Sequence, residues 1–270
     1  GAVPGDLLGD DRPGPVGRGR TIVPHTGGML PFLLLSTRHD DHLAADEHRA
    51  VARYLGVDPA RLVQWRLDQY PMPELQLERY AGLLLGGSPF TASDPPETKT
   101  GLQRRVEREL AGVLDEVVER DFPFLGLCYG VGTLGLHRGG VVDTTYGETL
   151  GAPTIRLTEA AADDPLCAHL PAEFRAIVGH KEALSHPAPD MTVLAASDAC
   201  PVQMLRVGEH VRATQFHPEL DAPGLIARIR AYTHHGYFRP DQEAELVRMA
   251  HATDVDASHR VLTAFAELYG

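Results

Sequence analysis

Short apolar runs alternate with amphipathic helical stretches between residues 29 and 128, and this alternation constrains the fold more than any other feature of the sequence. The runs LPFLLLST, VQWRL, YAGLLLGG and PFLGLC have the length and composition of buried strands. The stretches DHLAADEHRAVARYLG and LQRRVERELAGVLDEVVER have apolar residues at helical spacing. Strands that alternate with helices predict right-handed crossovers, a mainly parallel central sheet and a three-layer α/β sandwich with helices on both faces.

The pattern changes after residue 140. Shorter alternating segments (GVVDTTYGE, PTIRLTEA, TVLAASD, PVQMLRVG and VRATQFH) predict a mixed or antiparallel sheet that completes the same domain. Helical patterns follow at about 223–234, 241–252 and 257–268. We therefore expect a flexible N-terminal extension at 1–28, which is rich in Gly and Pro, one α/β domain at 29–238 and a C-terminal helical extension at 239–270.

Composition and charge exclude several classes of function. The chain of 270 residues is 43% hydrophobic, enough for one sizeable core, and its formal charge is -12. Because no Lys/Arg run interrupts this acidic balance, we expect neither a nucleic-acid partner nor a membrane surface. No apolar run approaches the roughly 18 residues that span a bilayer, and no signal peptide is evident. These features predict a cytoplasmic protein.

The cysteines Cys128, Cys167 and Cys200 lie far apart and lack C-x-x-C spacing, which argues against a disulfide framework and against a zinc site. Cys167 and Cys200 are interpreted as packing residues. The polar residues of 39–42 (HDDH) precede a helical pattern and are interpreted as a loop and helix cap. We predict neither a metal nor a cofactor.

Cys128 occupies the most distinctive local sequence, FPFLGLCYGVGTLGL. An apolar strand runs into the cysteine, and a glycine-rich turn then leads into a segment able to start a helix. This is the pattern of a nucleophile elbow, in which the glycines at 126, 130 and 132 relieve crowding. A thiol at a helix N-terminus is favoured as thiolate. A buried structural cysteine is the alternative for the motif taken alone.

A second motif, TQFHPEL, places His217 and Glu219 two residues apart at the end of an expected strand. In extended backbone these side chains would point to the same face, so the carboxylate could fix the tautomer of the imidazole. A turn carrying a surface ion pair is the alternative for His-Pro-Glu in isolation.

A third motif, LLLGGSPF, ends another expected strand with Gly86 and Gly87. Exposed backbone N–H groups at such glycines can stabilise an oxyanion, although a simple strand-to-loop turn is the more common explanation for an isolated Gly-Gly. All three motifs end strands, and a parallel sheet brings such ends to one edge. Their convergence indicates a single site.

Together, GGSP, GLCYG and QFHPE resemble the Cys-His-Glu signature of class I glutamine amidotransferase domains, with standalone relatives of the GMP synthetase glutaminase domain the nearest match. The resemblance covers residues from about 30 to 238 and implies a flavodoxin-like fold. It implies that Cys128 attacks the side-chain amide of glutamine, His217 carries the proton to ammonia and Glu219 orients His217.

The same resemblance implies further site residues. The backbone N–H groups of Gly87 and Tyr129 would form the oxyanion hole. The residues that would bind the substrate are Gly86, Gly87, Gly132, Gly179, His180, Lys181 and Gln215.

The chain departs from the family pattern at Gly132. The family usually reads Cys-x-Gly-x-Gln, and its glutamine helps to bind the substrate, whereas this chain has glycine at that position. Loss of a hydrogen-bonding side chain can lower selectivity on the order of 10⁴-fold. Alternatively, Gly132 makes room for a bulkier γ-glutamyl compound.

Three alternative functions are consistent with these motifs and with the resemblance. The first is a glutaminase that supplies ammonia to a partner synthetase, because the sequence contains neither G-x-x-x-x-G-K-S/T nor S-G-G-x-D-S. The second is a self-sufficient hydrolase or peptidase of γ-glutamyl conjugates. The third is a catalytically silent binding or regulatory protein with the same fold. The sequence leaves the oligomeric state open.

Overall fold

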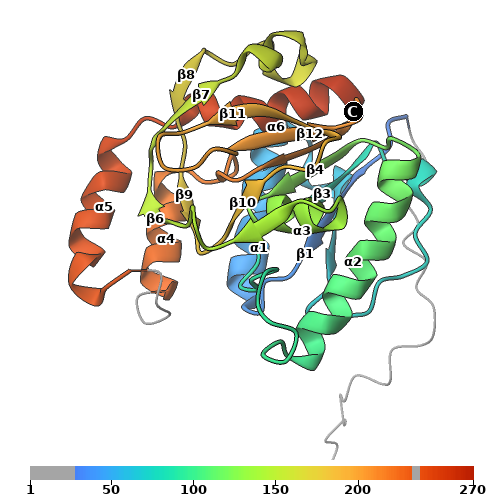
Figure 1. Cartoon of the computed structure of the whole chain (residues 1–270), viewed down its shortest axis with the longest axis horizontal. Coiled ribbons are helices and arrows are strands. Elements are labelled where there is room, and N and C mark those ends of the chain that lie inside the picture. The colour runs from blue at the N-terminus through green and yellow to red at the C-terminus, as the bar shows by residue number, and fades with distance from the viewer. Residues whose placement is uncertain (1–27, 233–237) are drawn as a thin grey trace, which may run out of the picture.

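The computed structural model describes residues 28–232 and 238–270 (Figure 1). Apart from Gly28, the predicted N-terminal extension lies outside the described residues, as do His234 and His235.

A nine-stranded sheet, formed by described residues, is the centre of the domain, with the order β2-β1-β3-β4-β13-β12-β11-β7-β8. The first five strands in this order run parallel, and they are β2 (Leu62–Arg66), β1 (Phe32–Ser36), β3 (Gly82–Leu85), β4 (Phe124–Leu127) and β13 (Val211–Thr214). The rest pair antiparallel: β12 (Met204–Val207), β11 (Met191–Ala196), β7 (Thr154–Leu157) and β8 (Glu173–Arg175). The mainly parallel α/β fold predicted from the alternating pattern is confirmed, as is the change to antiparallel pairing after residue 140.

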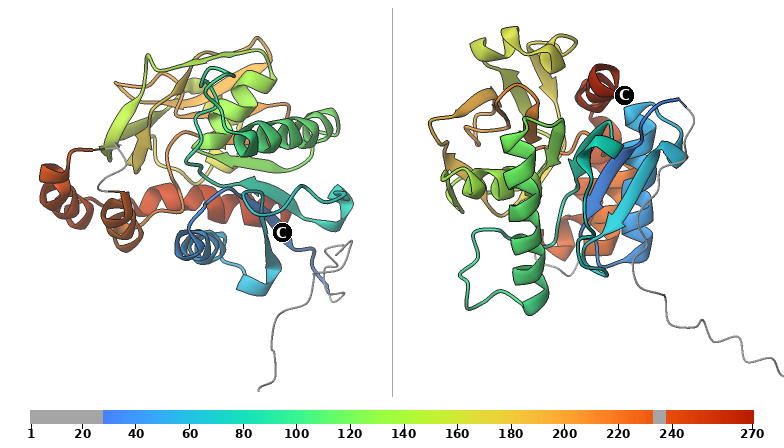
Figure 2. Two further views of the ribbon diagram at one scale, coloured as in Figure 1. Left: turned by 90° about the horizontal axis from the view of Figure 1, so that it is seen from below. Right: turned by 90° about the vertical axis from the view of Figure 1, so that its right-hand side faces the viewer.

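Helices cover both faces of this sheet (Figure 2). Helices α1 (Asp41–Leu55) and α6 (Asp256–Tyr269) cover one face, and α2 (Gly101–Glu119) and α3 (Tyr129–His137) cover the other. Successive residues of β1 point to opposite faces, so Phe32 and Leu34 join the first core while Leu33 and Leu35 join the second. A strand buried on both sides therefore reads as an unbroken apolar run.

Local capping fixes where the helices begin and end. The side chain of Asp40 accepts a hydrogen bond from Leu43 N at 2.9 Å and caps α1, so the predicted cap is confirmed, although Asp41 and His42 already belong to the helix. Gly56 ends the same helix with φ of 71°, a conformation that glycine adopts without steric cost. Thr100 caps α2 in the same way, by accepting from Gln103 N at 3.1 Å.

The C-terminal segment is partly built into the domain. The Phe265 ring on α6 lies 5.8 Å from that of Phe32 on β1, and Val261 and Leu262 are fully buried. Helix α6 thus belongs to the same hydrophobic core as the segment predicted for the α/β domain.

Two small sheets and two further helices border the carboxyl ends of the parallel strands. The sheets pair β5 (Val141–Asp143) with β10 (Ala183–His186) and β6 (Glu148–Gly151) with β9 (Val178–His180). The helices are α4 (Ala222–Tyr232) and α5 (Glu243–Ala252), which pack with β6 in a third apolar cluster. Among the described helices, none combines the length and apolar character needed to cross a bilayer.

Candidate active site

Cys128 lies between the end of β4 and the first residue of α3, with φ of 55° and ψ of -82°. This backbone conformation is rare for a residue with a Cβ atom and costs on the order of 1–3 kcal/mol. The neighbouring strand holds it in place, because Cys128 N donates to Thr214 O at 2.7 Å. The structure therefore forms the sharp strand-to-helix turn that the sequence predicts.

Close contact between Gly126 and Gly130 makes the turn sterically feasible. A Cβ atom on Gly126 would lie only 2.8 Å from the Cα atom of Gly130, which is backbone and cannot rotate away. Gly132 does not share this role, because the neighbour of its absent Cβ is a side chain of another segment.

His217 and Glu219 lie side by side in a turn that follows β13. Strand β13 ends at Thr214, and Leu220 N donates to His217 O at 3.3 Å to close the turn. The prediction of extended backbone here is wrong, yet the side chains still meet, because Nδ1 of His217 donates to Oε1 of Glu219 at 2.8 Å. The alternative of a surface ion pair is excluded, since Glu219 is 1% exposed.

Arg228 completes this arrangement and was not predicted from the sequence. It lies on α4 and donates from Nη2 to Oε1 of Glu219 at 3.1 Å. Its position depends on how α4 packs, and no motif around residue 228 indicates it. Arg228 adds a positive charge to the buried carboxylate, and the pKa of Glu219 is held well below its usual range: burial opposes this shift, and His217 and Arg228 outweigh it.

The thiol of Cys128 and the imidazole of His217 each stabilise the charged form of the other. Burial alone would raise the pKa of the Cys128 thiol, but the charge and hydrogen bond of His217, with His180 and Arg38, lower it below the ordinary value. Burial would likewise lower the pKa of His217, but Glu219 and Cys128 raise it to about 9. This arrangement favours a thiolate beside an imidazolium, which is the reactive form of a nucleophilic cysteine.

The loop after β3 brings Gly86 and Gly87 next to this pair. A Cβ on Gly87 would lie 3.1 Å from Cε1 of His217 and 2.5 Å from Nη2 of Arg38. Tyr129 is the first residue of α3, so its N–H has no carbonyl partner within the helix. Of the two residues predicted for an oxyanion hole, Tyr129 thus follows Cys128 directly in the chain and Gly87 lies beside His217.

A buried ion pair between Arg38 and Glu47 lies against the loop that contains Gly86 and Gly87. Arg38 Nε donates to Glu47 Oε1 at 3.1 Å, and Ser36 Oγ donates to Glu47 Oε2 at 2.8 Å. A Cβ on Gly86 would lie 2.7 Å from the Glu47 carboxylate. The ends of β1 and β3 are therefore fixed against α1, although sequence patterns did not reveal this support.

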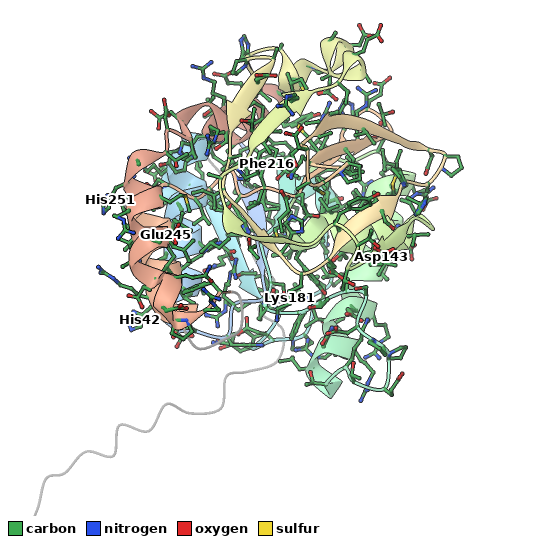
Figure 3. The ribbon with its side chains drawn as sticks, turned by 60° about the vertical axis from the view of Figure 1, so that its left-hand side comes forward. His42, Asp143, Lys181, Phe216, Glu245 and His251 are labelled. Carbon is green, nitrogen blue, oxygen red and sulfur yellow. The ribbon has the colours of Figure 1, made fainter. Side chains whose placement is uncertain are left out.

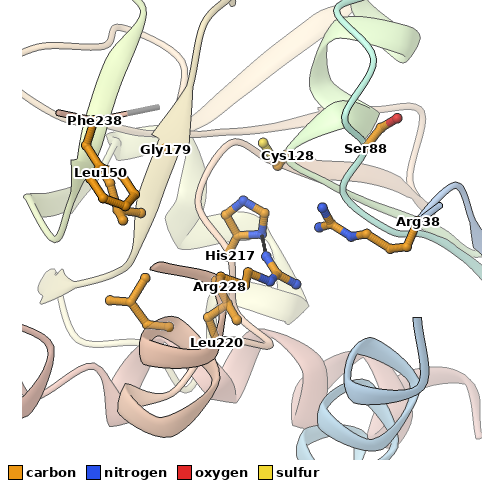
Figure 4. Close-up of a pocket in the computed structure, with 10 residues that line it drawn as sticks. Arg38, Ser88, Cys128, Leu150, Gly179, His217, Leu220, Arg228 and Phe238 are labelled. Carbon is orange, nitrogen blue, oxygen red and sulfur yellow. Dashed lines mark hydrogen bonds between the residues drawn. The ribbon is translucent and has the colours of Figure 1, made fainter. Parts of the chain in front are cut away.

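Cys128 lines two hollows that are formed by described residues. One, which we call the polar pocket, is lined by Ser88, Phe90, Thr91, Cys128, Tyr129, Gly132, Gly179, His180, Lys181, Glu182 and Gln215. The other, which we call the apolar pocket, is lined by Arg38, Ser88, Cys128, Leu150, Gly179, His217, Leu220, Leu225, Arg228 and Phe238 (Figure 4). In Figure 4, Leu150 and Phe238 lie on one side of His217 and Arg38 lies on the other. Of these two hollows, as the described residues form them, His217 lines the apolar pocket and not the polar pocket.

The substrate-binding residues implied by the resemblance gather largely in the polar pocket. Gln215 Nε2 lies 3.7 Å from Cys128 Sγ, at hydrogen-bond distance for sulfur. Both ring nitrogens of His180 contact protein acceptors, with Nδ1 2.8 Å from Glu182 O and Nε2 2.8 Å from Glu148 Oε2. His180 is thus fixed in the wall. Lys181 is exposed at the surface, whereas Phe216, beside Gln215 in the sequence, is fully buried (Figure 3).

Comparison with known families agrees with this geometry. The model of the family "Glutamine amidotransferase class-I" matches residues 48–223, more than half of the chain. The chain belongs to this family. The resemblance read from the three strand-end motifs is therefore confirmed at the level of the family.

Individual relatives of this class I chain are distant. One is a separate subunit of the glutamine-hydrolysing GMP synthase of Thermococcus kodakarensis, with 26% identity over 185 residues that cover 68% of this chain and 82% of the relative. Another is the GMP synthase of Xylella fastidiosa, with 28% identity over 162 residues that cover 58% of this chain. The chain spans only 28% of the length of that longer relative.

Solved structures share the class I fold at low identity. A glutamine amidotransferase from Thermotoga maritima superposes with a TM-score of 0.72 at 18% identity, covering 90% of this chain and 99% of that one. A glutamine amidotransferase from Methylobacillus flagellatus gives a TM-score of 0.63 at 16% identity, covering 90% and 96%. These similarities establish the fold.

The departure from the class I motif at Gly132 has a structural counterpart in Glu182. A Cβ atom on Gly132 would lie 2.9 Å from Oε1 of Glu182. The interpretation that Gly132 leaves room for a larger substrate is therefore wrong, because a carboxylate of this chain already occupies the space. The resemblance points to the segment 179–183 and names Gly179, His180 and Lys181 in it, but not Glu182.

Two groups of described residues could bring metal-ligating atoms together, and both have other partners. The buried group is Glu148, His180 and Cys200. Its atoms already contact one another and their neighbours, since Glu148 Oε2 also accepts from Gln203 Nε2 at 2.6 Å. In the half-exposed group, Asp121 accepts from the backbone N–H groups of Glu209 and His210. Neither geometry indicates a metal centre.

The two other cysteines are buried and far less acidic than Cys128. Burial raises the pKa of the Cys167 thiol to about 12 and that of the Cys200 thiol to about 11. Both occupy packing positions, as predicted.

Proposed function

We propose that this class I chain hydrolyses γ-glutamyl amides through a thioester on Cys128, with glutamine as the simplest substrate. The observation that carries the proposal is the position of Cys128, which lies in a strained elbow between the His217–Glu219 pair and a polar pocket.

The proposed reaction begins with attack of the Cys128 thiolate on the amide carbon of the substrate. The N–H groups of Gly87 and Tyr129 stabilise the oxyanion, and imidazolium at His217 gives its proton to the leaving nitrogen. The C–N bond breaks, ammonia or an amine departs and a glutamyl thioester remains. His217 then takes a proton from water, which attacks the thioester and releases glutamate with the thiolate restored. Glu219 orients the imidazole throughout.

The two hollows suggest how the substrate binds. A group that receives its proton from His217 must lie within reach of that ring, and His217 lines the apolar pocket but not the polar one. The departing nitrogen is accordingly assigned to the apolar pocket and the glutamyl group to the polar pocket.

Ammonia released in this way would serve a separate synthetase. This part of the proposal is supported by the relatives from Thermococcus kodakarensis and Methanopyrus kandleri, whose names describe one subunit of a glutamine-hydrolysing GMP synthase. Addition of the partner synthetase should then stimulate the release of ammonia from glutamine.

A second candidate function is the hydrolysis of γ-glutamyl conjugates with water as the only acceptor. It is favoured by the lining of the apolar pocket, where Leu150, Leu220, Leu225 and Phe238 surround part of a hollow that opens to solvent. Ammonia gains nothing from such a surface, whereas an aromatic or branched amine would bury apolar area there.

A substrate panel separates these functions. The rates of ammonia release from glutamine and of amine release from γ-glutamyl-p-nitroanilide are measured with the wild-type chain and with Cys128→Ala. Turnover of glutamine that increases with a synthetase supports the first function, and preference for the anilide supports the second. Leu150→Ala should raise KM for the anilide and leave KM for glutamine unchanged. Absence of turnover on the whole panel, with or without the synthetase, would reject both and favour a binding protein.

A further inference from the structure

The turn that carries His217 and Glu219 contacts a buried histidine of the C-terminal helix α6. The side chain of His259 is buried, and its Nδ1 lies 2.7 Å from the backbone oxygen of Pro218. Because a carbonyl oxygen can only accept, Nδ1 of His259 carries the proton and donates it to this bond. Pro218 has no N–H, so this oxygen is its one backbone hydrogen-bonding group. Helix α6 therefore holds the peptide between His217 and Glu219.

The ring of His259 is in turn held by Tyr54 on α1. The two rings stack, with their centroids 3.6 Å apart and their planes inclined by 7°. The hydroxyl of Tyr54 donates to Oδ2 of Asp221 at 2.9 Å. Burial, together with the neighbouring Asp221, raises the pKa of Tyr54 to about 12, so the hydroxyl keeps the proton that it donates. This pair, which we call the His259–Tyr54 stack, thus contacts the turn at Pro218 and at Asp221.

Asp221 extends the same contact to helix α4. Its Oδ1 accepts from the N–H of Gly224 at 2.9 Å, which caps the start of this helix. Arg228 lies one turn further along α4 and donates to Glu219 at 3.1 Å. A shift of the turn away from α1 and α6 would therefore move Arg228 together with the His217–Glu219 pair.

The position of the imidazole determines how acidic the thiol is. Burial raises the pKa of Cys128, and the charge and hydrogen bond of His217 are the main influences that bring it below the ordinary value. Both influences weaken when the ring moves away. Misplacement of a reacting group by about 1 Å can also cost on the order of 100-fold in rate. A turn that is no longer held should therefore give a less acidic thiol and a slower reaction.

We propose that His259 and Tyr54 are positioning residues, which hold the turn at residues 217–221 so that the imidazole of His217 lies beside Cys128. The inference rests on the proposed function, because it takes Cys128 and His217 as the reacting pair. The family model matches residues 48–223 and so ends before His259. Helix α6 is accordingly assigned a part in the architecture of the site as well as in the core.

The test follows the rate at which iodoacetamide alkylates Cys128 as a function of pH. His259→Phe keeps a flat ring for stacking but lacks the donor. In this variant the midpoint of the pH profile should rise towards the ordinary thiol value of about 8.5. On γ-glutamyl-p-nitroanilide, kcat should fall by about 10- to 100-fold with a smaller change in KM. A midpoint and a kcat equal to those of the wild-type chain would overturn the proposal.

His259→Asn tests the hydrogen bond separately, because its amide N–H can take the place of Nδ1. It should restore most of the lowered midpoint and of kcat. If His259→Asn is as impaired as His259→Phe, the hydrogen bond to Pro218 is not what positions the turn, and the proposal is wrong.

Ser258→Ala is the matched control on the same helix. Ser258 is fully buried, and its hydroxyl donates to Val255 O at 2.7 Å, within its own segment. The variant should lower the melting temperature but leave the midpoint and kcat unchanged. Equal shifts in Ser258→Ala and His259→Phe would show that any loss of packing in α6 has this effect, which would contradict a specific role for His259.

Tyr54→Phe gives a second test, because it removes only a hydroxyl and keeps the ring that stacks on His259. The midpoint should rise by a smaller amount, since Arg53 still contacts Asp221 at 3.1 Å. If His259→Phe does not fold, this variant decides, and a wild-type midpoint would overturn the proposal. Alkylation needs no turnover. If the wild-type chain cleaves no γ-glutamyl compound, the proposed function fails, and the pH profile of Cys128 still decides whether the stack positions His217.

Discussion

Glu219 accepts a hydrogen bond from Nδ1 of His217 at 2.8 Å, and its side chain is fully buried behind the imidazole. Arg228 contacts the same oxygen at 3.1 Å. The carboxylate therefore does two things: it fixes the tautomer that presents Nε2 towards the thiol, and it stabilises the ring when it carries a positive charge.

Glu219→Gln should lower kcat by about 10³-fold with little change in KM, because the amide can orient the ring in the wrong tautomer and cannot stabilise imidazolium. Steady-state kinetics on γ-glutamyl-p-nitroanilide measure the effect. The upper pKa of the pH profile should also move below the value of about 9 that His217 has in the intact site. Wild-type activity in this variant would contradict the role assigned to Glu219.

The pH dependence of activity should be bell-shaped. Below the pKa of Cys128, which lies under the ordinary thiol value, the nucleophile is protonated and inactive. Above the pKa of His217, about 9, the imidazole is neutral and has no proton for the leaving amine. A profile of kcat/KM from about pH 5 to 10 should rise and then fall accordingly. A rate that continues to increase beyond that range would show that no proton from His217 is needed.

Alkylation at neutral pH should be confined to one cysteine. The thiol of Cys128 has a lowered pKa, whereas Cys167 and Cys200 are buried and have pKa values of about 12 and 11. Mass spectrometry after brief treatment with iodoacetamide should show one adduct in the wild-type chain and none in Cys128→Ala. Equal labelling of Cys167 would contradict the account.

Gly126→Ala should destabilise the elbow by about 1–3 kcal/mol and reduce activity, because the new Cβ would lie 2.8 Å from backbone of Gly130. Gly112→Ala is the matched control, since position 112 lies within α2 and a Cβ there has no atom within 4 Å. It should raise stability by about 0.5–1 kcal/mol through helix propensity. Denaturant unfolding of the two variants measures both changes, and equal effects would reject the steric argument.

Asp164→Ala should cost about 3–5 kcal/mol of stability, because it leaves the fully buried guanidinium of Arg212 without its carboxylate partner at 3.1 Å. Arg206 also loses its contact with Asp164 at 3.0 Å. The exposed pair of Arg239 and Asp241 provides the control, and Asp241→Ala should change stability by less than about 0.5 kcal/mol. A small effect of Asp164→Ala in the same unfolding experiment would show that water reaches Arg212.

The fold and the position of the site were predictable because they depend on local patterns. Strands buried on both faces, such as β3 and β4, read as unbroken apolar runs, and each ends at a motif. A parallel sheet must bring these ends together, so the proximity of Gly87, Cys128 and His217 followed from topology.

The remaining features depend on packing between distant segments. Arg228 reaches Glu219 only because α4 folds back over the turn at residues 217–220, and no local pattern encodes that contact. The space beside Gly132 was predicted to be open because its neighbour, Glu182, lies far away in the sequence, between β9 and β10. Helix α6 was visible as an amphipathic pattern, but its place against Phe32 was not.

The central claim is that Cys128 forms a covalent thioester with a γ-glutamyl group, and intact-protein mass spectrometry of acid-quenched reactions tests it most directly. With γ-glutamyl-p-nitroanilide, the wild-type chain should gain the mass of one glutamyl group, and peptide mapping should locate it on Cys128. Cys128→Ala should gain nothing. Turnover of the anilide without any adduct on Cys128, or turnover that persists in Cys128→Ala, would contradict the account.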